Sequence, residues 1–162
     1  MMKACLELSH GLEKLVRVTD DPYSMEEFTA DEHIKLYTIV YDLCTAKGNC
    51  REMEEVMYDS FMETIEEYLS ERVLPPLQRM QGDELAQQFV TKWFVYKDVY
   101  EKVSHIFYYL LRSFMTRKIL DPAKVRTQLF YDGVFKEIHQ QVVGAAISMV
   151  GSFFHVWSIT TN

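Results

Sequence analysis

The chain has 162 residues, of which 48% are hydrophobic and 25% are charged, a composition typical of a globular protein and not of a disordered one. Its 24 acidic residues outnumber its 17 basic residues and give a formal net charge of -7, which opposes nucleic-acid binding because that binding depends on cationic contacts to phosphate. Only 6 glycines and 4 prolines occur, so few turn formers interrupt the chain and an all-α fold is predicted.

The N-terminus and the cysteines indicate an intracellular protein. Glu7 and His10 come before any long apolar run, so we expect no secretory signal. Cys5, Cys44 and Cys50 are an odd number without metal-ligand spacing, which favours a reducing environment over a disulfide framework.

The first two predicted helices rest on apolar periodicity and on a capping signal. Apolar residues recur at roughly helical spacing over residues 6–18 and give way to turn formers at 19–22. Thr29 and Glu32 form a capping-box pattern, in which the Thr29 hydroxyl accepts an early backbone N–H and the Glu32 carboxylate reaches back to the cap. The second helix is expected to run from there to about residue 46.

Three further helices are predicted before the break at Asp121-Pro122. The third covers about residues 51–73 and should end at Leu74-Pro75-Pro76. Asp83 can cap the fourth, which extends through Trp93 and Phe94. The fifth covers about residues 97–118, and the fourth and fifth can also be continuous.

A last long helix is predicted over residues 123–150, with a possible interruption at Tyr131-Asp132-Gly133. Without an internal repeat or a linker, the chain is predicted to be a helical bundle of about five helices plus one additional long helix. We divide it into a bundle at 1–118, a further helix at 119–150 and an apolar, uncharged tail at 151–162.

Two interpretations of the apolar C-terminal segment are open. The stretch 142–160 is free of charge and about as long as a membrane span, but its glycines, serines and His155 dilute its hydrophobicity. The favoured interpretation is a helix that has lost its neighbours and exposes an apolar surface prone to self-association.

No residue pattern indicates catalysis, a cofactor or a metal site. The histidines form no paired ligand motif, and Glu137-Ile138-His139 lacks the second histidine of a zinc-protease helix. The glycines are isolated, so no phosphate-binding loop is expected. Glu54-Glu55 and Glu66-Glu67 are adjacent acids on a predicted helix, and we expect them to lie on a solvated face.

Two predicted helices carry more apolar surface than one core contact needs. The core stripe of the second helix consists of Leu36, Ile39, Val40, Leu43 and Cys44. Beside this stripe lie Ile34, Tyr37, Thr38 and Tyr41. The core stripe of the fifth helix consists of Tyr100, Val103, Ile106, Phe107, Leu110, Leu111 and Phe114. Pointing away from it are His105, Tyr108, Tyr109, Arg112 and Met115.

These second faces allow two interpretations. Tyrosine, arginine and methionine are enriched in protein interfaces, which favours a partner-binding surface. The same aromatics could instead pack against other helices of a crowded bundle, as most aromatic stripes do.

Residues 36–45, LYTIVYDLCT, closely resemble a stretch near the start of cullins. Further segments that resemble the family follow in family order: Glu66-Glu67-Tyr68, Val73-Leu74-Pro75-Pro76-Leu77, Lys92-Trp93, Phe107-Tyr108-Tyr109-Leu110 and Phe135-Lys136-Glu137-Ile138-His139. The resemblance extends over about residues 11–150 and is closest to the cullin class that serves F-box ubiquitin ligases.

The resemblance implies a non-catalytic scaffold built of cullin repeats, with residues 1–118 as the first repeat and 119–150 as the opening helix of a second, incomplete one. In cullins the second and fifth helices of the first repeat bind an adaptor. We expect a Skp-type adaptor with its F-box receptor, with a BTB-type adaptor less favoured, and a cytoplasmic and nuclear location. By position the implied adaptor contacts are His33, Ile34, Tyr37, Thr38, Tyr41, Tyr109 and Arg112, with His105 and Tyr108 as additions.

Several departures from the family bear on function. The tryptophan common near the start of the first helix is replaced around Cys5, and the frequent Asp-Arg pair reads Leu111-Arg112. The C-terminal half of cullins, which binds a RING protein, is missing, so we expect no RING binding and consider a truncated product. The expected function is adaptor binding, with competition against intact cullin as a further hypothesis, and the alternative is an inert truncated product.

Overall fold

The computed structural model describes residues 2–46 and 50–160, with side chains described for 2–46 and 51–151. The described residues form helices and turns without a strand, which confirms the predicted all-α fold. In chain order the elements are α1 (Met2–Asp20), α2 (Ala30–Thr45), α3 (Cys50–Tyr68), the π-helical turn η1 (Leu69–Val73), α4 (Leu74–Gln78), α5 (Gly82–Ile106), α6 (Tyr108–Lys118), α7 (Pro122–Phe130), the π-helical turn η2 (Tyr131–Phe135) and α8 (Lys136–Thr160).

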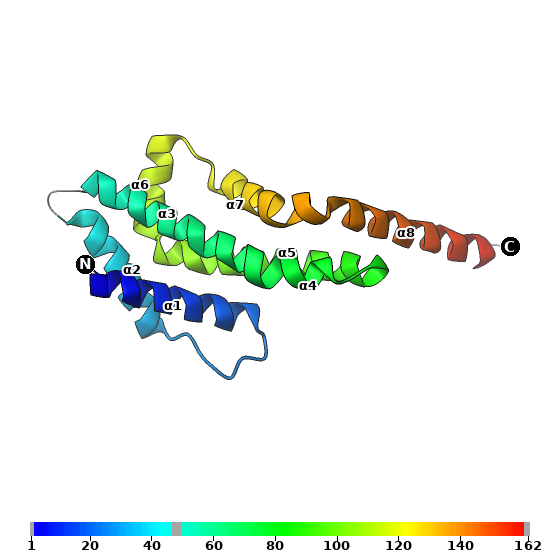
Figure 1. The fold of residues 1–162 in the computed structure, drawn as a ribbon, viewed down its shortest axis with the longest axis horizontal. Coiled ribbons are helices and arrows are strands. Elements are labelled where there is room, and N and C mark those ends of the chain that lie inside the picture. The colour runs from blue at the N-terminus through cyan, green and yellow to red at the C-terminus, as the bar shows by residue number, and fades with distance from the viewer. Residues whose placement is uncertain (1, 47–49, 161–162) are drawn as a thin grey trace.

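The helices pack around one elongated core. In Figure 1, α1, α3, α5 and the run from α7 to α8 lie along the long axis, whereas α6 stands across it at the end where α2 lies. One cluster of buried side chains joins Leu8 of α1, Phe61 of α3, Tyr96 of α5 and Ile138 of α8. The C-terminal part of α8 projects beyond the other helices (Figure 1), and Ile147 is 68% exposed there.

The start of α2 agrees with the predicted capping box. The Glu32 backbone N–H donates to Thr29 Oγ1 at 3.2 Å, and the Thr29 backbone N–H donates to Glu32 Oε2 at 2.8 Å. The Lys14 ammonium donates to Glu32 Oε1 at 2.6 Å, and these hydrogen bonds hold the pKa of the Glu32 carboxyl at about 2. The cap therefore also fixes α2 against α1, since Lys14 belongs to α1.

The prolines after the third helix do not end it as predicted. The chain passes from α3 through the π-helical turn η1 directly into α4, and Pro75 and Pro76 lie in the first turn of α4. Proline is tolerated there because the first N–H groups of a helix have no intrahelical partner.

Of the two arrangements predicted for the fourth and fifth helices, the continuous one agrees with the structure up to residue 106, because α5 runs without a break from Gly82 to Ile106. Its N-cap is Gln81 and not Asp83, which lies in the first turn. The interruption comes instead at Phe107, whose φ is −94° and ψ is 14°. No glycine or proline marks this position, so local sequence gave no signal for it.

The predicted interruption at residues 131–133 is a local widening of the helix. Residues Tyr131–Phe135 form the π-helical turn η2, after which α8 continues to Thr160 and includes most of the segment that we predicted as a tail. A Cβ atom at Gly133 would lie 3.2 Å from Leu69 Cδ1, so the two π-helical turns approach each other closely here. The division into three domain segments stays a prediction.

The membrane interpretation of the C-terminal segment finds no support. Within residues 2–46 and 50–160, no helix combines the length and the apolarity that crossing a bilayer requires.

Gly11 allows α1 and α2 to approach each other closely. A Cβ atom there would lie 2.6 Å from both terminal methyl carbons of Leu36, which is only 3% exposed. Gly144 of α8 is the opposite case, because a Cβ atom there would have nothing within 4 Å.

We therefore expect Gly11→Ala and Gly144→Ala to change stability in opposite directions. Alanine favours a helix by about 1 kcal/mol over glycine, and Gly144→Ala should gain most of this in the free energy of unfolding. Gly11→Ala should instead lose about 1 kcal/mol, because overpacking costs roughly 1–3 kcal/mol. Urea denaturation followed by circular dichroism measures both, and two changes of the same sign would contradict the assigned packing.

Candidate functional site

The residues that the resemblance singled out come together on one face of the molecule. The Tyr41 ring of α2 contacts the Tyr109 ring of α6 edge-on, with centroids 4.8 Å apart. Tyr37 stacks beside Tyr41 at 6.4 Å, and the His33 and His105 rings lie 6.5 Å apart. Residues about seventy positions apart in the sequence thus form a single surface, which we call the α2–α6 face.

Several large side chains of the α2–α6 face are exposed. Ile34 is 63% exposed, Tyr41 41% and Tyr108 54%. The remaining members divide between exposed (Thr38, His105, Arg112) and half-buried (His33, Tyr37, Tyr109). Packing within the bundle therefore accounts for the core stripe, where Leu36 and Val40 are buried, and in part for Tyr109, which packs against the core. It leaves Ile34, Tyr41 and Tyr108 largely uncovered.

Met115 is a correction to the predicted outward face. We expected it to point away from the core, but it is only 3% exposed. The following αL residue Ile119 ends α6, and α7 then packs near enough that Met115 and Pro122 line a common cavity.

An ion pair between α3 and α6 holds α6 in place. The Arg117 guanidinium pairs with the Glu54 carboxylate, which also accepts a hydrogen bond from Ser113 Oγ at 3.2 Å. Glu54 is only 5% exposed, so our prediction of a solvated face is wrong for this residue. The prediction of a solvated position is correct for Glu55, which is exposed and whose carboxylate lies 3.5 Å from the Lys118 ammonium.

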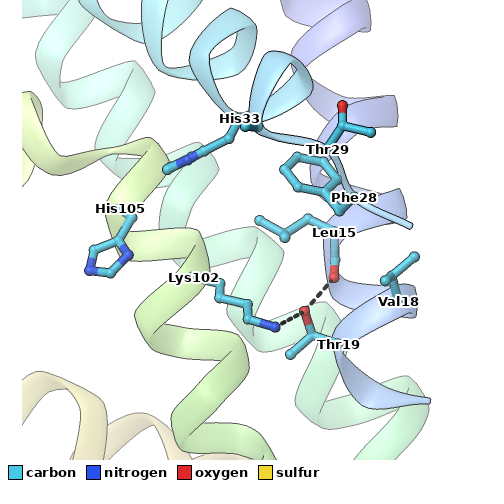
Figure 2. A pocket seen from close by; sticks show the side chains of 9 residues that line it. Leu15, Val18, Thr19, Phe28, Thr29, His33, Lys102 and His105 are labelled. Carbon is cyan, nitrogen blue, oxygen red and sulfur yellow. Dashed lines mark hydrogen bonds between the residues drawn. The ribbon is translucent and has the colours of Figure 1, made fainter. Parts of the chain in front are cut away.

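A cavity of about 340 Å³ lies between α1, the segment before α2, and α5. Figure 2 shows His33 reaching from α2 toward α5, and the Lys102 ammonium donating to Thr19 Oγ1 at 3.4 Å. The His33 Nε2 atom is buried and has no hydrogen-bond partner. The lining residues are Leu15, Val18, Thr19, Phe28, Thr29, Ala30, His33, Lys102 and His105.

A second cavity, of about 450 Å³, lies between the α5–α6 junction and α7. His105 lines both cavities and therefore lies between them. Burial raises the pKa of the Tyr100 phenol in its wall to about 12, so this phenol stays neutral at physiological pH. The lining residues are Tyr100, Glu101, Ser104, His105, Tyr108, Leu111, Arg112, Met115, Pro122 and Arg126.

Sequence reasoning missed the contribution of α7 to this region. Arg126 follows no motif, and only the packing of α7 beside the α5–α6 junction brings it near Arg112. Phe28 was missed because it precedes the predicted second helix, where no functional face was assigned. Lys102 lies on the predicted fifth helix but was not among the residues of its second face.

The surface is suited to recognition by its aromatic and cationic side chains. In the described part of the chain, no three His, Cys, Asp or Glu side chains are grouped as a metal site. Exposed tyrosines beside an arginine provide contact area together with hydrogen-bond donors, the combination common at protein interfaces.

Comparison with known proteins identifies the family. The family model described as the cullin alpha solenoid domain matches residues 8–152. The chain belongs to the cullin family. The cullin alpha solenoid domain, which residues 8–152 match, is a scaffold region and is itself non-catalytic.

The relatives of this cullin include both long and short proteins. It is 28% identical to Cullin-1 of Oryza sativa subsp. japonica over 144 residues, which cover 88% of this chain and 19% of that protein. It is 26% identical to the putative cullin-like protein 1 of Arabidopsis thaliana over 141 residues, again 19% of the relative. Cullin-like protein 3 of Arabidopsis thaliana is 24% identical, and the match covers 54% of it. No solved structure gives a significant match.

The placement of α6 should depend on Glu54 and not on its neighbour. Glu54→Gln keeps an acceptor for Ser113 but removes the charge that pairs with Arg117. We expect a loss of about 1–3 kcal/mol in the free energy of unfolding, at the lower end because the Arg117 side chain is 48% exposed. The matched variant Glu55→Gln should change it by less than about 0.5 kcal/mol. Chemical denaturation of both variants tests this, and equal effects would refute a specific role for Glu54.

Proposed function

We propose that this chain is a non-catalytic docking module of the ubiquitin-ligase pathway, which binds a Skp-type adaptor through its α2–α6 face. The observation that carries the proposal is the contact between Tyr41 and Tyr109, which joins α2 and α6 into one exposed aromatic surface. The same positions resemble those at which cullins bind their adaptors. Membership of the cullin family supports this assignment.

The chemistry of the face supports protein binding over catalysis. Tyr37, Tyr41 and Tyr109 support one another through ring contacts, so their side chains lose little further freedom when a partner binds. The Thr38 hydroxyl donates to the Ile34 carbonyl oxygen at 2.8 Å, so its donor is already used within α2. A partner can therefore cover this side chain without leaving that donor unpaired.

The primary test is a calorimetric titration of the purified chain against Skp-type and BTB-type adaptors, after circular dichroism has established its helicity. Saturable binding to a Skp-type adaptor is the expected result. Binding only to a BTB-type adaptor would assign the module to another ligase class. A folded chain that binds neither would favour the inert product.

The double variant Tyr37→Ala with Tyr41→Ala should weaken adaptor binding by about 2 kcal/mol or more, roughly 30-fold in Kd, because truncation of interface tyrosines removes buried aromatic area. The control is Phe94→Ala with Tyr131→Ala, which removes two exposed aromatics from α5 and η2, away from the α2–α6 face. The control should bind within about twofold of the parent chain. Unchanged affinity of the tyrosine variant, at unchanged helicity, would refute the assigned face.

The second part of the proposal is competition with an intact cullin for the same adaptor. When both are expressed at equal levels with similar affinities, the amount of adaptor captured with the intact cullin should fall to about half. The Tyr37→Ala, Tyr41→Ala variant should leave that amount unchanged. Competition is ruled out if the parent chain accumulates to equal levels and cullin-bound adaptor stays constant.

A further inference from the structure

The cavity between the α5–α6 junction and α7 combines unpaired positive charge with apolar walls. The Nε atom of Arg126 is buried and has no hydrogen-bond partner. Arg112 is exposed at the other side of the cavity, and within the described residues neither guanidinium is in an ion pair. A buried guanidinium N–H without an acceptor costs free energy, so the site favours a ligand that supplies an oxygen.

The balance of charge in this cavity favours an anion. Glu101 is the one acidic side chain among the lining residues, against the two guanidinium groups of Arg112 and Arg126. If one arginine turned toward Glu101, the other would still lack a partner. Carboxylates match the planar donor fork of arginine and can accept two parallel hydrogen bonds from it.

The apolar part of the lining indicates what accompanies the carboxylate. Leu111, Met115 and Pro122 contribute aliphatic surface, and Tyr108 contributes an aromatic side chain. Such a mixed site suits an acidic residue next to an apolar residue better than a small inorganic anion, which would leave the apolar walls in contact with water.

The cavity is continuous with the α2–α6 face. His105, Tyr108 and Arg112 line the cavity and also belong to the positions implied as adaptor contacts. A partner that covers Tyr41 and Tyr109 and extends past His105 would therefore reach the mouth of this cavity.

We propose that the cavity lined by Arg112 and Arg126 receives an acidic side chain and an adjoining apolar side chain of the adaptor docked on the α2–α6 face. The proposal rests on the adaptor-binding function proposed above and extends the interface to α7. Arg126 then supplies specificity for a partner with a carboxylate at this point, because an adaptor without one would leave the guanidinium unpaired.

Arg126→Met tests the proposal with little structural disturbance. Methionine keeps an aliphatic stem of similar length and removes the charge, and the backbone contact from the Tyr96 hydroxyl to the Arg126 carbonyl oxygen, at 2.7 Å, remains. The matched control is Arg79→Met, an exposed arginine between α4 and α5, near the start of α5, whereas the cavity lies at its end. Arg112→Met is a second variant at an exposed position, which keeps the test decisive if Arg126→Met does not fold.

The measurement is the Kd for the Skp-type adaptor at several sodium chloride concentrations, with helicity and melting temperature checked for each variant. We expect Arg126→Met and Arg112→Met each to weaken binding about tenfold or more, and to make affinity less dependent on salt than in the parent chain. Arg79→Met should stay within about twofold.

The outcomes separate this proposal from the one on which it rests. If the parent chain binds the adaptor and Arg126→Met and Arg112→Met bind it as tightly as Arg79→Met, the cavity proposal is wrong and the docking function stands. A loss of affinity without a change in salt dependence would also overturn it, because the arginines would then act through packing. If the folded parent chain binds no adaptor, both proposals fail.

Discussion

The burial of Phe107 sets the position of α6, and the candidate site depends on that position. The Phe107 side chain is completely buried and contacts the Phe61 ring with centroids 5.5 Å apart. The backbone there leaves the regular helical conformation, and α6 consequently crosses the long axis that α5 follows (Figure 1). Had the helix continued straight, Tyr109 would not reach Tyr41 of α2, and the two apolar faces would remain separate.

Polar contacts between distant elements complete this arrangement. Glu54 of α3 pairs with Arg117 and holds the far end of α6, so this helix is fixed at both of its ends.

At the other side of the bundle, the Asp20 carboxylate accepts a hydrogen bond from the Tyr68 hydroxyl at 2.9 Å and one from the Lys92 ammonium at 3.1 Å. An acid at the C-terminal end of α1 is unfavourable next to the helix dipole, and these two donors offset that cost. Burial raises the pKa of the Tyr68 phenol, which keeps it a donor.

The α2–α6 face and the two cavities form a continuous region around His105. One cavity reaches toward α1 and the other toward α7, so a partner docked here would lie near elements about 100 residues apart in the sequence. The region has a central aromatic group of Tyr37, Tyr41 and Tyr109, and cationic groups at its margin. A central aromatic anchor with charged residues around it is typical of interfaces in which packing gives affinity and charge gives specificity.

Much of this protein follows from its sequence alone. The scarcity of glycine and proline indicated the all-α fold, and the capping box at Thr29 and Glu32 placed the start of α2. The second apolar faces together with the resemblance to cullins indicated residues that meet at the site. These features are local, or repeat along a helix, and so can be read from a single chain.

Other features depend on contacts between residues far apart in the sequence. The interruption at Phe107, the burial of Glu54 and of Met115, and the approach of Arg126 to Arg112 were not predicted, because none of these positions has a local signal. Pro75 and Pro76 gave a misleading local signal for the end of a helix, since proline fits the first turn of a new helix as well as a loop. The sequence therefore determined which helices form and which faces are apolar, whereas the tertiary structure decided where α6 turns and which charges meet, since both depend on side chains supplied by other helices.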